Sequence, residues 1–146
     1  TRLAYFREHR SLEGVPAVDF GNEGEPIARD FFAANTEYEV LKCGLVVRDK
    51  HCWLGASPDS LIWSKNRPGF GVLEIKCKHS YVDPVILPLH DVPELDDNNE
   101  KLKDTDPWYY QIQIQAWVCN ATYAILFLWT GFDYKIIEVP IDHNWA

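Results

Sequence analysis

The chain has 146 residues, of which 47% are apolar and 14% aromatic, enough for one compact core and too few for two. No run approaches the roughly 20 apolar residues of a membrane-spanning helix, and the N-terminal stretch lacks the apolar segment of a signal peptide. The formal net charge of −8 speaks against DNA binding, because contacts to phosphate need Lys and Arg.

The sequence contains no methionine, even at position 1, so we expect residues 1–146 to be a single domain that is a fragment or a processed chain. Its four cysteines form no CxxC pair and have no companion CxxH, which argues against a zinc site and a disulfide framework. Free thiols are typical of a reducing, intracellular compartment. The cysteines are Cys43, Cys52, Cys77 and Cys119.

The first predicted element is a helix over residues 22–34. Pro26 suits the first turn of a helix, and acidic residues cluster near this start. Apolar residues recur at helical spacing from Ile27 to Ala34. This prediction places Glu25 near the helix N-terminus, where the ionised form of a carboxyl group is favoured.

Four short segments rich in β-forming residues follow the helix. Turn-forming stretches separate them at residues 48–50, 57–59 and 66–69. We interpret the segments as the strands of an antiparallel meander, over residues 38–47, 52–55, 60–63 and 72–76.

Residues 83–107 contain four prolines and are predicted to be a long excursion with one small hairpin turning at Asn98 and Asn99. Residues 91–106 hold seven acids and two lysines, a net charge of −5, so the rest of the chain carries −3. Clustered carboxylates can also be neutralised by a bound metal ion, which reverses the local field. The acidic net charge therefore does not exclude a nucleic-acid substrate.

The chain closes with a predicted helix over residues 108–121 and two strands over 123–130 and 134–139. The helix carries three glutamines in an otherwise apolar segment, so we expect it to be buried. The predicted fold class is α/β, a mixed central sheet flanked by helices. We expect the helix with Glu25 and the glutamine helix to lie on the active-site side of that sheet.

The most informative residues are two acids and a lysine on adjacent predicted strands. Asp59 follows a proline in a turn, and Glu74 and Lys76 alternate along the next strand, with Ile75 facing the core between them. The hairpin brings the two acids together. Carboxylates of Asp59 and Glu74 are hard oxygen ligands for a Mg²⁺-type ion, and the carbonyl group of Ile75 is a plausible third ligand.

This set of residue types fits phosphodiester hydrolysis. A bound metal ion lowers the pKa of a water molecule and neutralises charge that develops on the phosphoryl oxygens. Lys76 is placed to orient that water and to stabilise the transition state. Each residue alone also has an ordinary interpretation, since Asp after Pro is a common turn and Glu-x-Lys occurs on many solvated strands.

Four blocks of sequence resemble, in order, the YqaJ-type viral recombinase family, which includes phage lambda exonuclease and is a branch of the PD-(D/E)xK nucleases. The resemblance covers about four fifths of the chain and implies a restriction-endonuclease-like core. The blocks are Gly24-Glu-Pro-Ile-Ala-Arg-Asp-Phe, Gly55-Ala-Ser-Pro-Asp-Ser-Leu, Leu73-Glu-Ile-Lys-Cys and Tyr109-Tyr-Gln-Ile-Gln-Ile-Gln-Ala-Trp.

The resemblance implies a role for individual residues. Asp59 and Glu74 match the metal-binding acids of the family, and Lys76 matches its catalytic lysine. Glu25 matches a helix glutamate that completes the metal site or a second one, although an acid at a helix start can also serve only the helix dipole. Gln111 matches a glutamine at the active site.

Further residues are candidates for contacts to DNA or for packing around the site. Ser57 matches a residue that helps hold a terminal 5′-phosphate in the exonuclease branch. Lys78 and His79 follow the catalytic strand and could contact DNA phosphate, although a solvated strand end explains them equally well. Gln113 is interpreted as a core amide bonded to neighbouring backbone. The aromatic residues at 108–110 are interpreted as core or rim side chains.

We therefore predict a Mg²⁺- or Mn²⁺-dependent deoxyribonuclease, an exonuclease that acts on duplex DNA ends in recombination or repair. The family's 5′-phosphate segment has no clear counterpart before residue 22, which leaves end-processing open. The alternatives are a catalytically silent module that binds DNA or protein, and a nicking endonuclease. The sequence gives no oligomeric state, and a homo-oligomeric ring trimer rests on the resemblance alone.

Overall fold

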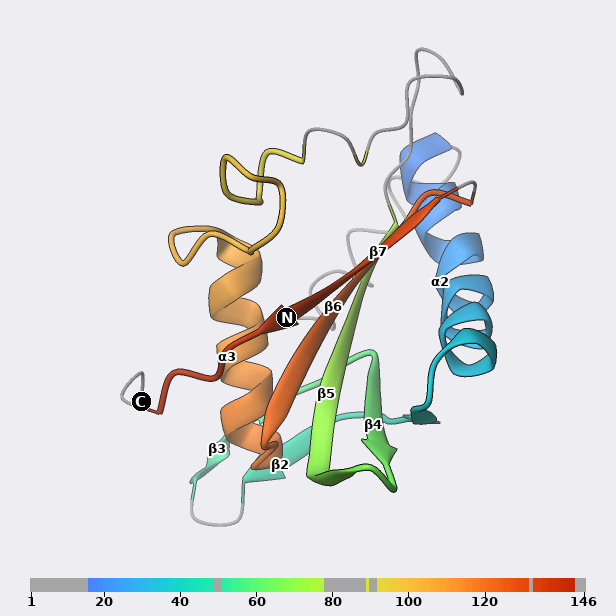
Figure 1. The fold of residues 1–146 in the computed structure, drawn as a ribbon. Helices are drawn as coiled ribbons and strands as arrows, with labels where there is room; N and C mark the ends of the chain where they lie inside the picture. The colour runs from blue at the N-terminus through green and yellow to red at the C-terminus, as the bar shows by residue number, and fades with distance from the viewer. Residues whose placement is uncertain (1–15, 49–50, 78–88, 90–91, 132, 144–146) are drawn as a thin grey trace.

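The structure is a computed structural model that describes residues 16–48, 51–77, 89, 92–131 and 133–143 (Figure 1). Its centre is a five-stranded sheet in the order β1-β4-β5-β6-β7. Only β5 and β6 are parallel; the other neighbours are antiparallel, so the sheet is mixed, as predicted. The strands are β1 (Glu39–Lys42), β4 (Ser60–Ser64), β5 (Arg67–Cys77), β6 (Tyr123–Trp129) and β7 (Tyr134–Val139).

The first helix of the described chain, α2, runs from Pro16 to Asn35 and is longer than the helix predicted over residues 22–34. Pro16 occupies the first position, where a missing N–H is harmless, and Pro26 lies inside the helix. The prediction that Glu25 lies near the helix N-terminus was wrong. The apolar face with Ala28 and Phe32 packs on the sheet, and this burial outweighs the preference of proline for a helix start.

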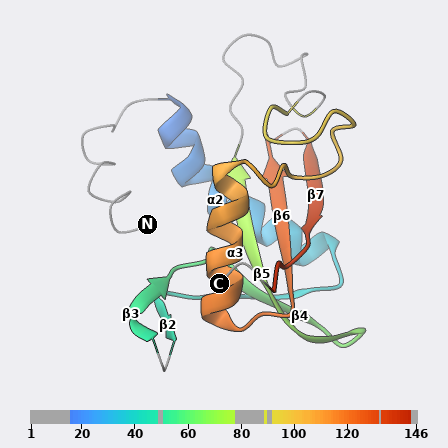
Figure 2. The ribbon, with the colours of Figure 1, turned by 90° about the vertical axis from the view of Figure 1, so that its left-hand side faces the viewer.

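The predicted antiparallel meander was also wrong in its first half. The segment predicted as one strand over 38–47 divides into β1 and β2 (Val46–Arg48), which belong to different sheets. β2 pairs with β3 (His51–Ala56) in a separate ribbon beside α3 (Pro107–Cys119), as Figure 2 shows. β1 instead pairs with β4, which the chain reaches after the ribbon.

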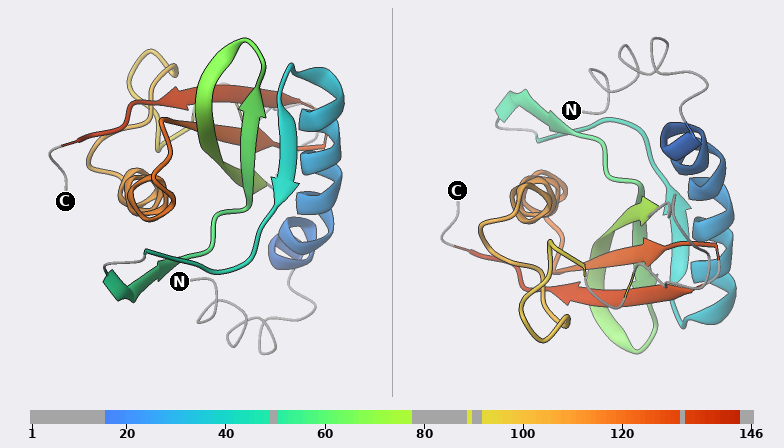
Figure 3. Two further views of the ribbon diagram at one scale, coloured as in Figure 1. Left: turned by 90° about the horizontal axis from the view of Figure 1, so that it is seen from below. Right: turned by 90° about the horizontal axis from the view of Figure 1, so that it is seen from above.

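The two long helices cover opposite faces of the sheet (Figure 3). One core forms under α3 from Ile112, Ala116 and strand residues that include Val72. The other forms under α2 around Phe32 and includes Leu73. The expectation that both helices lie on one side of the sheet was therefore wrong. Consecutive residues of β5 enter different cores because the strand is covered on both faces.

The excursion before α3 is ordered where the structure describes it. Leu95 and Leu102 form an antiparallel bridge, and Asn99 has φ of 57° in the turn between them, so the predicted small hairpin is confirmed. The Asn99 side chain accepts from the backbone N–H of Val92 at 3.0 Å and donates to the carbonyl oxygen of Leu89 at 2.6 Å. The hairpin thereby fixes apolar residues of the α3 core.

The C-terminal elements agree with the prediction. α3 begins after Asp106, whose side chain accepts from the Trp108 N–H at 2.9 Å, and ends at Asn120 in the left-handed conformation. It supplies the crossover that a parallel β5–β6 pair requires. In the part of the chain that the structure describes, no helix is long and apolar enough to cross a membrane.

Candidate active site

The β4–β5 hairpin brings Asp59 beside Glu74. Ser60 pairs with Leu73, so the residue before Ser60 lies next to the residue after Leu73. The Asp59 Oδ2 atom accepts the backbone N–H of Ile75 at 2.8 Å. Both acids are only 5% exposed, and burying two carboxylates is costly unless polar partners compensate.

Partners for Glu74 come from the same strand and from α3. The Gln111 Nε2 atom donates to Glu74 Oε1 at 3.1 Å, and Lys76 Nζ lies 3.4 Å from the same oxygen. Lys76 also donates to Gln111 Oε1 at 3.1 Å, and its Nζ lies 5.4 Å from the centre of the Trp108 ring. Lys76, Glu74 and Gln111 therefore form a closed triangle of contacts, which fixes both ends of the amide.

The second oxygen of Glu74 accepts a hydrogen bond from a residue that the sequence analysis did not single out. The Gln115 Nε2 atom donates to Glu74 Oε2 at 3.0 Å. Gln111 and Gln115 are four residues apart and so lie on one face of α3. The only signal in the sequence was the unusual number of amides in this helix.

Glu25 lies on α2, on the opposite face of the sheet from Gln111. Its Oε1 atom forms an ion pair with Arg29 Nη2 at 2.9 Å. The Nε atom of Arg29 donates to Ser60 Oγ at 2.9 Å, and Ser60 donates to the carbonyl oxygen of Asp59 at 2.7 Å. Arg29 thus connects Glu25 to Ser60, the first residue of β4, which follows Asp59, a link that sequence reasoning missed.

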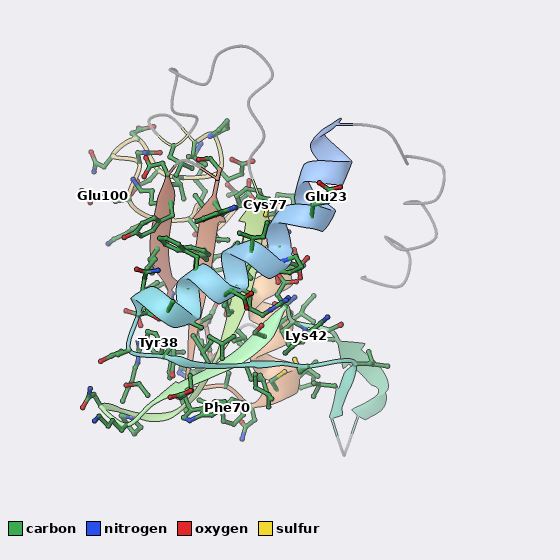
Figure 4. All side chains as sticks on the ribbon, turned by 90° about the vertical axis from the view of Figure 1, so that its right-hand side faces the viewer. Glu23, Tyr38, Lys42, Phe70, Cys77 and Glu100 are labelled. Carbon is green, nitrogen blue, oxygen red and sulfur yellow. The ribbon has the colours of Figure 1, made fainter. Side chains whose placement is uncertain are left out.

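Cys77 marks where α2 approaches the end of β5. Figure 4 shows it beside the part of α2 that carries Glu23. A Cβ atom added to Gly24 would lie 3.3 Å from Cys77 Sγ, so only glycine allows this approach without a shift. Burial, and then the charges of Glu25 and Asp59, raise the pKa of the Cys77 thiol to about 12. Both carboxylates therefore act on the region around this sulfur.

The remaining predicted residues have different surroundings. Ser57 is half-buried in the loop between β3 and β4. Lys78 and His79 lie outside the described residues. Gln113 donates to the carbonyl oxygen of Pro140 at 2.7 Å and accepts the Asp142 N–H at 2.9 Å, so its interpretation as a core amide bonded to backbone is confirmed.

The chemistry of these donors fits a hard divalent cation in part. Asp59 and Glu74 are buried acids at neighbouring positions, and the Ile75 carbonyl points to the same side of β5 as the N–H that Asp59 accepts. Within the described ranges, however, no three His, Cys, Asp or Glu side chains are grouped so that they could hold a metal ion. Glu25 therefore does not complete a three-acid cluster with the other two.

A family model described as the YqaJ-like viral recombinase domain matches residues 4–124, most of the chain. The chain belongs to this family. The match contains the acid pair, Lys76 and the glutamines of α3. The resemblance deduced from the four sequence blocks is thereby confirmed. No curated protein sequence matches the chain.

Solved structures with a similar fold include an alkaline exonuclease from Laribacter hongkongensis, LHK-Exo. It is 21% identical with a TM-score of 0.62, and the alignment covers 89% of this chain and 61% of that one. The same exonuclease in complex with dAMP gives 21% identity and a TM-score of 0.64, over 86% and 58% of the two chains. A structure named SSO0001 gives 19% and 0.54, over 95% and 61%.

These likenesses show that the chain has a nuclease-type fold, as predicted. The chain spans about three fifths of the length of the proteins it resembles.

Proposed function

We propose that this chain is a metal-dependent DNA nuclease domain that hydrolyses phosphodiester bonds, with Mg²⁺ or Mn²⁺ as its cofactor. The observation that carries the proposal is the contact between Lys76, Glu74 and Gln111 next to buried Asp59. A solvated strand surface would leave its acids exposed, whereas here two acids on one hairpin are buried and an ammonium group is held beside them by hydrogen bonding. They match the needs of phosphoryl chemistry in residue type and placement.

The two acids are proposed to hold the cation, with the Ile75 carbonyl as a further ligand. When bound, such an ion lowers the pKa of a water molecule and offsets negative charge on the phosphate. Glu25 is proposed to act from the α2 side, through Arg29 and Ser60, on the position of Asp59.

Lys76 is proposed to orient the attacking water and to stabilise charge on the phosphoryl oxygens. An ammonium group has three N–H donors. One donates to Gln111, and the ion pair with Glu74 takes a second direction; among the described residues, no hydrogen bond takes the third, which is proposed to face water or phosphate. Gln111 keeps the ammonium group in place because its own amide nitrogen is held by Glu74.

The substrate is proposed to be DNA, and cleavage from duplex ends in recombination or repair is favoured over internal cutting. The support is the family and the fold shared with an alkaline exonuclease whose structure has also been solved with dAMP. Ser57, Lys78 and His79 remain candidates for contacts to DNA phosphate. An assembly of several copies around DNA stays a proposal based on the family resemblance.

The test is digestion of linear duplex DNA, with and without a 5′-phosphate, beside closed circular DNA in Mg²⁺, Mn²⁺ or EDTA. Lys76→Ala should slow cleavage by about 100-fold or more, the usual contribution of a positioned proton-transfer or charge-stabilising group. Lys65→Ala, at an exposed turn residue, is the matched control and should cleave normally. Near-UV circular dichroism establishes that each variant is folded.

Metal-dependent shortening of linear DNA that is lost only in Lys76→Ala supports the exonuclease, whereas cutting of circles indicates an endonuclease. If the folded wild-type protein and both variants are equally inert, the catalytic proposal is wrong. A domain of this fold that binds DNA or protein without cleaving would then take its place.

A further inference from the structure

We infer that Gln115 is a positioning residue of the metal site, and that it selects Glu74 Oε2 as the oxygen that binds the cation. The inference rests on the proposed function, which makes Glu74 a metal ligand. Its own basis is the distribution of hydrogen bonds around the Glu74 carboxylate.

The two oxygens of Glu74 are occupied unequally by described residues. Oε1 receives Gln111 Nε2 at 3.1 Å and has Lys76 Nζ at 3.4 Å. Oε2 receives Gln115 Nε2 at 3.0 Å. An ionised carboxylate has about four lone-pair directions, two on each oxygen. Each oxygen therefore accepts one hydrogen bond from the described residues, and only Oε1 also lies beside a cationic group, so Oε2 is the oxygen whose negative charge is less compensated.

The orientation of the Gln115 amide supports this assignment. Gln115 is 4% exposed, and its Oε1 atom has no hydrogen-bond partner among the described residues. A buried polar atom without a partner is unfavourable and is uncommon in native proteins. Rotating the amide would place this oxygen against Glu74 Oε2, so that two acceptors would face each other. The amide is therefore oriented by the need of an ionised Glu74 for a donor.

The position of Gln115 fits an orienting function rather than a contact with substrate. It is four residues after Gln111 on the same face of α3, so the helix presents two amides to the two oxygens of one carboxylate. This fixes the plane of the carboxylate from both sides. Groups that orient a metal ligand in this way commonly change metal affinity by about 10- to 100-fold when they are removed.

Gln113 provides a matched control. It is a buried amide of the same helix, 2% exposed, and both of its hydrogen bonds go to the backbone of residues 140 and 142. Replacing Gln113 or Gln115 with methionine removes an amide of similar size from similar surroundings. Only Gln115→Met removes a donor to Glu74.

The experiment is calorimetric titration of the full chain with Mn²⁺ or Mg²⁺ in the absence of DNA, together with the Mg²⁺ dependence of cleavage. Gln115→Met should raise the metal dissociation constant about 10-fold or more and raise the Mg²⁺ concentration for half-maximal cleavage in parallel. Gln113→Met should lower thermal stability and change neither metal constant by more than about twofold. Equal metal constants for wild type and Gln115→Met overturn the inference.

Failure of this inference is distinguishable from failure of the proposed function. If the wild-type protein cleaves DNA and Gln115→Met has the same metal dependence, only the inference about Gln115 fails. If the wild-type protein binds metal without cleaving DNA, nuclease activity fails and calorimetry alone decides the inference. If it neither binds metal nor cleaves DNA, both are wrong.

A measurement on the wild-type protein covers the case in which Gln115→Met does not fold. In a ¹⁵N-labelled sample, the side-chain amide signals of Gln115 should shift on saturation with Mg²⁺, and those of Gln113 should stay in place. Unchanged Gln115 signals at saturating Mg²⁺ overturn the inference.

Discussion

Gly71→Ala should destabilise the protein because the ring of Tyr123 occupies the space of the new methyl group. A Cβ atom on Gly71 would lie 2.3 Å from Tyr123 Cε2 and 2.4 Å from Cδ2. The ring cannot move aside easily, since Tyr123 is 3% exposed and its hydroxyl group donates to the carbonyl oxygen of Ile62 at 3.2 Å. The Arg67 guanidinium group lies 3.9 Å from the ring centre on the ring face. Tyr123 lies opposite Gly71 in the β5–β6 pair, and its hydrogen bond to Ile62 reaches β4, the strand that follows Asp59.

The size of the effect follows from three contributions. Overpacking a buried site lowers the free energy of unfolding by about 1–3 kcal/mol. Losing the Tyr123 hydrogen bond to Ile62 lowers it by about 1 kcal/mol more. Alanine recovers about 0.5–1 kcal/mol because glycine loses more backbone entropy in a strand. The net loss is about 1–3.5 kcal/mol, equivalent to a fall in melting temperature of about 2–14 °C for a domain near 150 residues.

The assay is urea unfolding of a double-mutant cycle that combines Gly71→Ala with Tyr123→Leu. In the Tyr123→Leu background the new methyl group has room, so Gly71→Ala should be neutral or slightly stabilising. The coupling free energy between the two sites should then be about 2–4 kcal/mol, the sum of the overpacking and hydrogen-bond contributions, because the entropy gain of alanine is the same in both backgrounds. An equal loss of unfolding free energy from Gly71→Ala in both backgrounds would refute the steric explanation.

Two further predictions concern the α2 side of the site. Arg29→Met should lower the free energy of unfolding by about 2 kcal/mol. The substitution removes a nearly buried guanidinium group together with its ion pair to Glu25 and its hydrogen bond to Ser60. In the same urea assay, Glu138→Gln, which removes an exposed ion pair, should cost less than about 1 kcal/mol. Burial and nearby carboxylates raise the pKa of Cys77 to about 12, so at pH 8 its thiol should react with iodoacetamide more slowly than in the urea-unfolded chain. Peptide mapping should also show faster alkylation in Glu25→Gln, and unchanged rates would contradict this account.

The sequence was sufficient for the parts of the site that depend on local patterns. Glu74 and Lys76 share a strand face because side chains alternate, and Asp59 reaches them through a short hairpin whose turn residues are recognisable. α3 was predictable because Pro107 marks its start and apolar residues recur at helical spacing after it, although the predicted end at residue 121 passed the left-handed Asn120 that closes the helix.

Other features were not predictable because they depend on contacts between distant segments. β1 pairs with β4, with Leu41 opposite Leu61, and no local signal shows that β2 and β3 leave the sheet between them. Pro26 favoured a helix start there, and only the packing of Phe32 on the sheet shows that α2 continues through it. The contact of Gln115 with Glu74 appears only once α3 is placed over β5.

Two of the acidic residues in the 91–106 segment, Asp96 and Asp106, stabilise the local structure, so the negative charge they add to the chain has a function unrelated to the substrate. Asp96 accepts the backbone N–H of Glu100 at 2.9 Å and that of Lys101 at 3.2 Å, and these bonds lower its pKa. Asp106 caps α3. These acids close the hairpin and start the glutamine helix, whose N-terminal end the segment approaches in Figure 1.

Whether a DNA phosphate is attracted or repelled depends on the charge of the candidate site rather than on the net charge of the chain. The candidate site contains the carboxylates of Asp59 and Glu74, and Glu74 is paired with Lys76, so these three side chains together carry −1. A divalent ion held by Asp59 and Glu74 would change this to +1. The site is therefore repulsive to DNA phosphate without metal and attractive with it. This sign change predicts that binding of DNA, and not only its cleavage, depends on the metal ion.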